Sequence, residues 1–194
     1  YSFFLLAVFI LPLCFNIDFI LSLWLKEIPA YTNIFVILFL ANVLAESYST
    51  YLITVLLATG KIAFYQASVG TILLLNVPLS YLAFQWGYPP VSFLVVSIIL
   101  AFAASALRLF LLKKRFSFSI TLFLRSVFLK TLLTILLVSA LNFMLLNLRS
   151  LLPYGNILVL LFSCLISMGG IYILGLNSEE RRIVIVQAKK YLHR

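Results

Sequence analysis

One acidic residue stands in the middle of a long apolar run. Glu46 is the only charged residue between Tyr31 and Ala58. A charge at the centre of a bilayer costs about 3 kcal/mol or more, so its side chain must face protein or water. Asn42, Ser49 and Thr50 share its helical face. This polar stripe predicts either a wet cavity with a protonatable carboxylate, coupling transport to an ion gradient, or a protonated Glu46 in an interhelical hydrogen bond.

Three further polar residues inside apolar runs are candidate site residues, Arg108 for contact with a headgroup or phosphate and the other two for a translocation path. Arg108 lies one turn inside the end of its run, where it either snorkels to lipid headgroups or faces a cavity and contacts a phosphate. Asp18 lies about 12 Å along a helix from Lys26, and it either pairs with a basic residue or lines the path. Asn76 is near Pro78, whose missing N–H frees a carbonyl, so Asn76 either satisfies groups at a kink or lines the path.

No pattern typical of an enzyme or of a cofactor site is visible. Cys14 and Cys164 lie inside apolar runs, and the single histidine, His193, is next to the last residue. We therefore expect no disulfide framework, no metal site and no cofactor. The sequence shows no Ser/His/Asp set and no pair of catalytic carboxylates, so we expect no enzymatic activity and no catalytic residue.

The composition indicates an integral membrane protein. The 194 residues are 64% hydrophobic and 10% charged, with a mean hydropathy of +1.19. Soluble domains are about half apolar and about a quarter charged. Lipid offers no partner for backbone groups, and the alternating pattern of barrel strands is missing, so we predict an all-α fold. The net charge of +9 comes from basic residues at the ends of apolar runs, which indicates control of topology and not binding of nucleic acid.

Six runs are long enough to cross a bilayer, since a spanning helix needs about 20 apolar residues. Pro12 is expected to kink or break the first run, and Pro78 the third. Small residues four positions apart predict close-packed helix faces at Ala101 with Ser105 and at Ser163 with Ser167. The predicted runs are Ser2–Leu25, Tyr31–Ala58, Ile62–Trp86, Val91–Leu112, Lys130–Leu148 and Asn156–Leu176.

The basic residues also predict an orientation. If the six runs alternate across the membrane, Lys26 and Arg149 fall on one side and the other twelve of the 14 basic residues on the opposite side. Loops rich in Lys and Arg face the cytoplasm, so both ends of this segment are expected there. We divide the chain into 1–112 with four spans, 113–129 as a cytoplasmic interfacial segment, 130–176 with two further spans, and 177–194 as a cytoplasmic amphipathic tail.

Four stretches occur in an order that resembles a known family. They are "LSLWLKEIPAY" (Leu21–Tyr31), "LLATGKIAFYQ" (Leu56–Gln66), "LLNVPLSYLAFQWGYPP" (Leu74–Pro90) and "RLFLLKKR" (Arg108–Arg115). This series resembles the carboxyl-terminal part of bacterial polysaccharide-biosynthesis flippases, of the O-antigen type, in the multidrug, oligosaccharidyl-lipid and polysaccharide exporter superfamily. The matching positions are Leu23, Trp24, Leu25, Ala58, Gly60, Lys61, Leu75, Asn76, Pro78, Leu79, Ser80 and Tyr81.

The resemblance implies an architecture and a function. The family has two six-helix lobes around a polar cavity, and this chain is similar to the last four helices of the second lobe plus two extra helices. The chain begins inside apolar sequence, so we expect a fragment whose partner is the missing amino-terminal lobe. The implied function is the flipping of a lipid-linked oligosaccharide across the bacterial inner membrane by alternating access, among membrane lipids and without nucleic acid.

Two other functions compete with this one. A drug or small-solute exporter of the same superfamily would share the helices and differ in the charges of the cavity. An integral-membrane glycan polymerase or ligase would need a sizeable outer loop with Arg, His or acidic groups. The predicted outer loops are only a few residues long, so the flippase remains the favoured interpretation, with Asn42, Glu46, Thr50, Asn76 and Asp18 lining the path and Arg108 meeting a phosphate.

Overall fold

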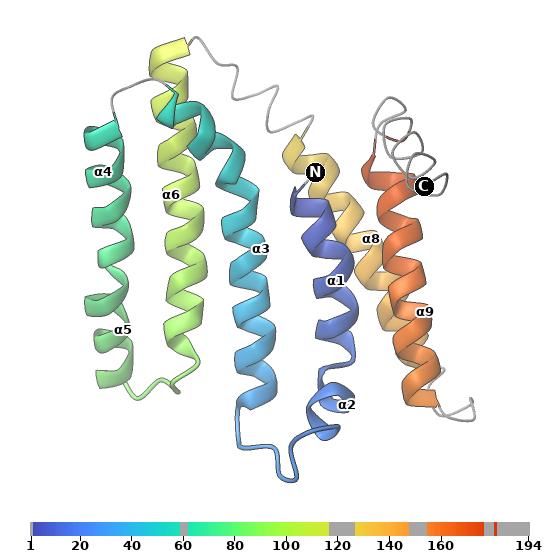
Figure 1. Cartoon of the computed structure of the whole chain (residues 1–194). Helices are drawn as coiled ribbons and strands as arrows, with labels where there is room; N and C mark the ends of the chain where they lie inside the picture. Colours follow the sequence, from blue (N-terminus) through green and yellow to red (C-terminus); the bar gives the residue numbers. More distant parts are fainter. Residues whose placement is uncertain (1, 59–61, 117–126, 148–154, 177–180, 182–194) are drawn as a thin grey trace. The chain divides into compact units, whose positions relative to one another are not determined.

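The structure is a computed structural model that describes residues 2–58, 62–116, 127–147, 155–176 and 181 (Figure 1). Its elements are all helical, with no strand among these residues, which confirms the predicted all-α class. The helices are α1 (Ser2–Phe15), α2 (Ile17–Ser22), α3 (Thr32–Leu57), α4 (Ile62–Leu74), α5 (Asn76–Gln85), α6 (Ser92–Phe116), α8 (Leu129–Leu146), α9 (Gly155–Gly170) and the π-helix η3 (Ile171–Gly175).

Five helical stretches are long and apolar enough to cross a membrane, which supports the prediction of a membrane-embedded protein. They coincide with five of the predicted runs. Two of them combine neighbouring elements, α4 with α5 and α9 with η3. The five stretches are Thr32–Leu57, Ala63–Gln85, Ser92–Lys113, Leu129–Leu146 and Gly155–Gly175.

The first predicted run, Ser2–Leu25, forms two short helices instead of one span. Asn16 separates α1, of 14 residues, from α2, of 6 residues. The backbone N–H of Asn16 donates to the Pro12 carbonyl at 3.1 Å, and its side-chain amide donates to the same oxygen at 3.0 Å. Asn16 thus closes α1, and the expected effect of Pro12 takes the form of a break four residues downstream.

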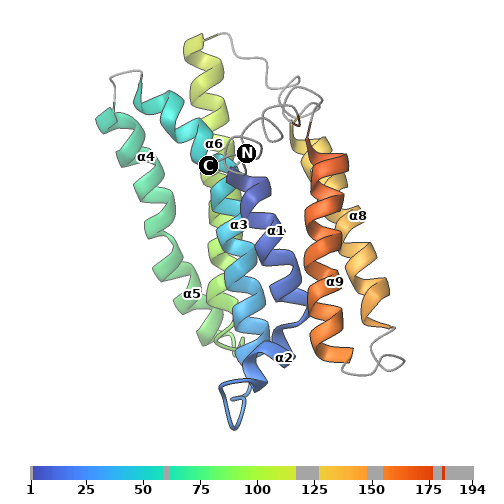
Figure 2. The same ribbon diagram turned by 45° about the vertical axis from the view of Figure 1, so that its right-hand side comes forward.

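The chain divides into two compact units. In the unit that extends from Ile17 to Phe123, α6 packs against α3, α4 and α5 (Figures 1 and 2). The buried centre of this unit joins α3, α4 and α6 through apolar side chains. These side chains are Leu52, Leu56, Tyr65, Val69, Ala104 and Leu112.

The other unit contains α1, α8, α9 and η3, and polar side chains are buried in its core. Ser163 and Ser167 are completely buried, and so is Asn142, which confirms the close-packed face predicted on α9. The Asn142 amide donates to Ser167 Oγ at 3.2 Å, and the Asn16 amide donates to Ser163 Oγ at 3.3 Å. Small residues let helices approach closely in membranes, and interhelical hydrogen bonds of this kind hold them together.

The last predicted segments fall mostly outside the described residues. Helix α6 extends to Phe116, so the beginning of the 113–129 segment continues this helix and is no separate element. Residues 117–126 and, apart from Arg181, the 177–194 tail lie outside the described ranges.

Candidate functional site

Helix α3 carries a polar face halfway along its length. Glu46 lies 14 residues after Thr32, about 21 Å along the helix. Its side chain is exposed, and the Asn42 amide donates to Glu46 Oε1 at 3.2 Å. Thr50 is exposed one turn further on, whereas Asn42 Oδ1 is fully buried and has no partner among the described residues. The structure thus places three of the predicted path residues one turn apart on a helix that is long and apolar enough to cross a membrane.

Arg108 is buried at the junction of three helices. Its side chain is 8% exposed. Its Nε donates to the Tyr65 hydroxyl at 3.1 Å, and its Nη1 donates to Ser49 Oγ at 2.7 Å. The guanidinium on α6 therefore lies against α3 and α4, within the protein. No ion pair involves Arg108 within the described part of the chain.

The Arg108 cluster and the Glu46 face lie one helical turn apart. Ser49, which accepts the hydrogen bond from Arg108, donates its own hydroxyl to the backbone carbonyl of Glu46 at 3.0 Å. Ser49 and Arg108 stand 17 and 16 residues after the first residues of α3 and α6, about 24–26 Å along each helix. A polar connection thus links the buried cation to the turn that bears the exposed carboxylate.

The remaining predicted path residues lie in other contacts of the same unit. Asn76 follows Leu75, the residue that separates α4 from α5, and its amide donates to Ser97 Oγ on α6 at 2.8 Å. Ser80 Oγ donates to Asn76 Oδ1 at 3.0 Å. Asp18 on α2 accepts a hydrogen bond from the Asn33 amide at the start of α3. Both residues thus connect neighbouring helices, and neither belongs to the Glu46 face.

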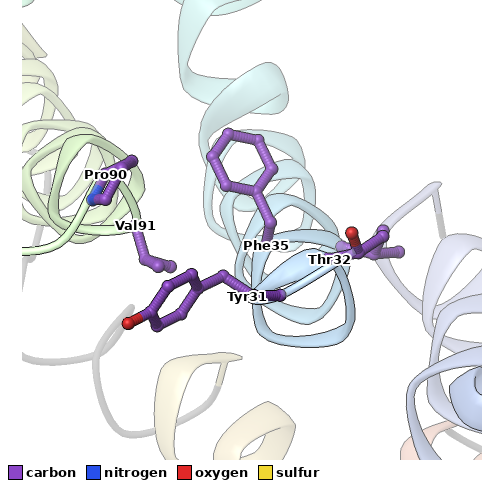
Figure 3. A pocket seen from close by; sticks show the side chains of 7 residues that line it. Tyr31, Thr32, Phe35, Pro90 and Val91 are labelled. Atoms are coloured by element: carbon purple, nitrogen blue, oxygen red, sulfur yellow. The ribbon is translucent and has the colours of Figure 1, made fainter. Parts of the chain in front are cut away.

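A small apolar pocket lies near the first turn of α3. Its volume is about 240 Å³, and its polar side-chain groups are the hydroxyls of Tyr31 and Thr32. The Tyr31 ring extends toward Val91, and Tyr31 adopts a left-handed backbone conformation with φ 69° (Figure 3). The pocket contains no charged side chain that could recognise a phosphate. It is lined by Ala30, Tyr31, Thr32, Phe35, Val36, Pro90 and Val91.

Aromatic side chains gather around this same end of the unit. Trp24 and Trp86 are 77% and 76% exposed, and Tyr88 is also exposed. These residues lie in or beside the two connections that precede α3 and α6. Trp and Tyr are enriched where a membrane meets water. This distribution of aromatic residues is typical of a membrane interface at this end of the unit. Arg108, on α6, lies toward the opposite end.

Tyr65 and the pairing of Ser49 with Arg108 were not predicted. These partners stand 43 and 59 residues from Arg108 in the sequence. One sequence signal was available for Tyr65. Tyr65 carries a hydroxyl close to the beginning of its span, and Arg108 is close to the end of the following span. If these two spans pack antiparallel, Tyr65 and Arg108 lie at similar depths in the membrane.

The described residues contain no group of three or more His, Cys, Asp or Glu side chains that could hold a metal ion. The site therefore consists of an exposed carboxylate with amide and hydroxyl neighbours, and of a buried guanidinium one turn away. Such groups can bind sugars, protons and anions by hydrogen bonding and charge.

Comparison with known proteins adds no relative: no family model, no curated protein and no solved structure matches this chain.

Proposed function

We propose that this chain is part of a transporter that flips a lipid-linked oligosaccharide across the bacterial inner membrane by alternating access. The lipid tail stays in the bilayer, and the sugar headgroup passes along the polar face of α3. The other wall of the path belongs to the amino-terminal lobe that the resemblance implies. The unequal distribution of basic residues supports a cytoplasmic location for both ends of this segment.

The exposure of Glu46 carries this proposal. In a helix of 26 residues that is long and apolar enough to span a membrane, Glu46 is exposed about 21 Å from the first residue. A carboxylate facing hydrocarbon at that depth is strongly disfavoured, so this face requires water or another polar surface. Asn42 and Thr50, eight residues apart, extend this polar face over two turns, about 12 Å along the helix.

The chemistry of the face suits a sugar. Amide, carboxylate and hydroxyl groups donate and accept hydrogen bonds with sugar hydroxyls, and several weak contacts allow release on the other side. Glu46 and Thr50 are exposed on this face, and their side chains are the groups that a sugar hydroxyl can reach. No bond is made or broken in this process, so the function needs no catalytic residue and no cofactor.

The test is the water accessibility of position 46 in the full-length protein. Cys14 and Cys164 are replaced, and a single cysteine is placed by Glu46→Cys. We expect labelling by a small, charged, membrane-impermeant thiol reagent, and protection when lipid-linked oligosaccharide is added. Tyr51→Cys is the matched control, because Tyr51 is also exposed, at 68%, but on a different face of α3. If position 46 reacts no faster than position 51 in folded protein, the polar path does not exist.

A small-solute exporter is the second candidate, and the sign of the charge favours it in one respect. The accessible charge on α3 is a carboxylate, which attracts a cationic solute more readily than a phosphate-bearing lipid. If a cationic drug protects the Glu46→Cys variant from labelling and the lipid-linked sugar does not, the exporter replaces the flippase as the proposed function.

A further inference from the structure

Arg108 keeps part of its hydrogen-bonding capacity unused. A guanidinium has five N–H donors. Nε and Nη1 bind Tyr65 and Ser49, whereas Nη2 has no partner among the described residues. Arg108 is 8% exposed, so a small part of its side chain remains accessible. The cluster of Arg108, Tyr65 and Ser49 therefore leaves the Nη2 edge of the guanidinium without a partner among the described residues.

The two existing hydrogen bonds fix this edge in place. The Tyr65 ring is buried and packs in the apolar centre shared by α3, α4 and α6, so its hydroxyl has little freedom. Ser49 is 1% exposed and bonded to the α3 backbone. Both partners are neutral, so they orient the guanidinium without cancelling its charge. A buried ion without a counter-charge is costly, and a bound anion would remove that cost.

The depth of the cluster indicates where the anion comes from. Arg108 stands five residues before the end of the span Ser92–Lys113, and Tyr65 two residues after the start of the span Ala63–Gln85. These offsets correspond to about 8 Å and about 3 Å along the helices. Ser49 stands eight residues before the end of the span Thr32–Leu57, so the cluster lies within about 12 Å of the ends of its spans, on the side toward the lipid headgroups. Exposed Lys113 marks the same end of α6.

We propose that Arg108, held by Tyr65 and Ser49, is a binding site for the phosphate group of a lipid. The Nη2 edge and the second hydrogen on Nη1 donate to phosphate oxygens, a geometry that guanidinium groups favour. Tyr65 and Ser49 are positioning residues. This inference goes beyond the proposed function, because such a site would bind a lipid phosphate whether or not the chain transports a substrate.

The test measures lipid binding and not transport. Purified full-length protein in phosphatidylcholine nanodiscs is titrated with short-chain phosphatidic acid or phosphatidylglycerol, and bound lipid is counted by native mass spectrometry. Arg108→Gln should weaken binding by about ten- to hundredfold, the loss expected for charge-assisted hydrogen bonds. Lys113→Gln, which removes an exposed charge from the same helix, should change it less than about twofold.

A second variant separates the positioning role from the charge. Tyr65→Phe keeps the buried ring and leaves Arg108 charged, so it should fold normally and weaken binding by about threefold to tenfold. Tyr81→Phe is its control, because Tyr81 is exposed and its hydroxyl accepts a hydrogen bond from Gln85, on the same helix and away from Arg108. Should Arg108→Gln fail to fold, the difference between Tyr65→Phe and Tyr81→Phe decides the question.

Competition distinguishes the two sources of lipid phosphate. Displacement of bound phosphatidic acid by lipid-linked oligosaccharide pyrophosphate would assign the site to a transported substrate. Persistence of phosphatidic acid under the same conditions would assign it to a membrane phospholipid. The proposal is overturned if folded Arg108→Gln binds as the unaltered protein does, if Lys113→Gln weakens binding equally, or if Tyr65→Phe and Tyr81→Phe do not differ.

Discussion

At Gly170 the structure predicts that any larger side chain will clash with a neighbouring helix. A Cβ atom built on Gly170 would lie 2.7 Å from Val138 Cγ2, whereas ordinary contacts begin at about 3.4 Å. Val138 is completely buried on α8, and its branched side chain has a strongly preferred rotamer in a helix. Neither partner can move aside easily, so Gly170→Ala should force the two helices apart.

The neighbouring glycine allows the size of this effect to be isolated. A Cβ on Gly169 meets nothing within 4 Å. Both substitutions gain the same helix propensity, about 1 kcal/mol for Gly to Ala. Overpacking a closed interface costs about 1–3 kcal/mol. Gly170→Ala should therefore be less stable than Gly169→Ala by about 1–3 kcal/mol, since the propensity terms cancel in the comparison.

The assay is reversible unfolding of the purified protein in mixed detergent and SDS, followed by circular dichroism. Val138→Ala removes the methyl group that Gly170→Ala would strike, so the double variant should recover about 1–2 kcal/mol relative to the sum of the single changes. Equal stability of the two glycine variants, or strict additivity with Val138→Ala, would refute a close approach of α8 and α9 at this point.

Three other substitutions test separate contacts, each by the same unfolding assay. Ser167→Ala removes the acceptor of the Asn142 amide and should cost about 0.6–2 kcal/mol, the range for hydrogen bonds between membrane helices. Tyr31→Gly should change the stability by less than about 1 kcal/mol, because relief of the left-handed backbone, about 1–2 kcal/mol, is offset by the lost contacts of the ring in the pocket and by the freer unfolded chain. Asn76→Leu should cost about 1–2 kcal/mol by removing its bond to Ser97, and hydrogen exchange at the α4–α5 break should accelerate.

The helices themselves could be predicted from local sequence. Apolar runs of spanning length, separated by short polar or proline-containing stretches, place five helical stretches within a few residues of their observed ends. The break after α1 could not be located in this way. Pro12 indicates that the helix is kinked or broken nearby. The residue at which the helix ends depends on the hydrogen bond from the Asn16 side chain to the Pro12 carbonyl, and asparagine occurs both inside helices and at their ends.

The candidate site was only partly predictable. Asn42, Glu46 and Thr50 were recognised because helical periodicity is a local property. The partners of Arg108 depend on how α3, α4 and α6 pack, and packing is decided by apolar residues that resemble one another throughout this chain. For Asp18, the sequence suggested a basic partner or a path, and the neutral amide of Asn33 at the next helix start was not foreseen.

The two compact units use buried polar groups in different ways. In the unit of α1, α8 and α9, the amide N–H groups of Asn16 and Asn142 donate to serine hydroxyls on α9 and so hold helices together, while Asn142 Oδ1 is buried without a partner among the described residues. In the other unit, the Arg108 guanidinium keeps an open edge and Glu46 keeps an exposed carboxylate. In a low-dielectric setting, fully satisfied polar groups rigidify a fold, whereas a buried charge without a counter-charge is costly, and a bound ligand of opposite charge would lower that cost. For this reason Glu46 and Arg108 are the residues where binding should be measured.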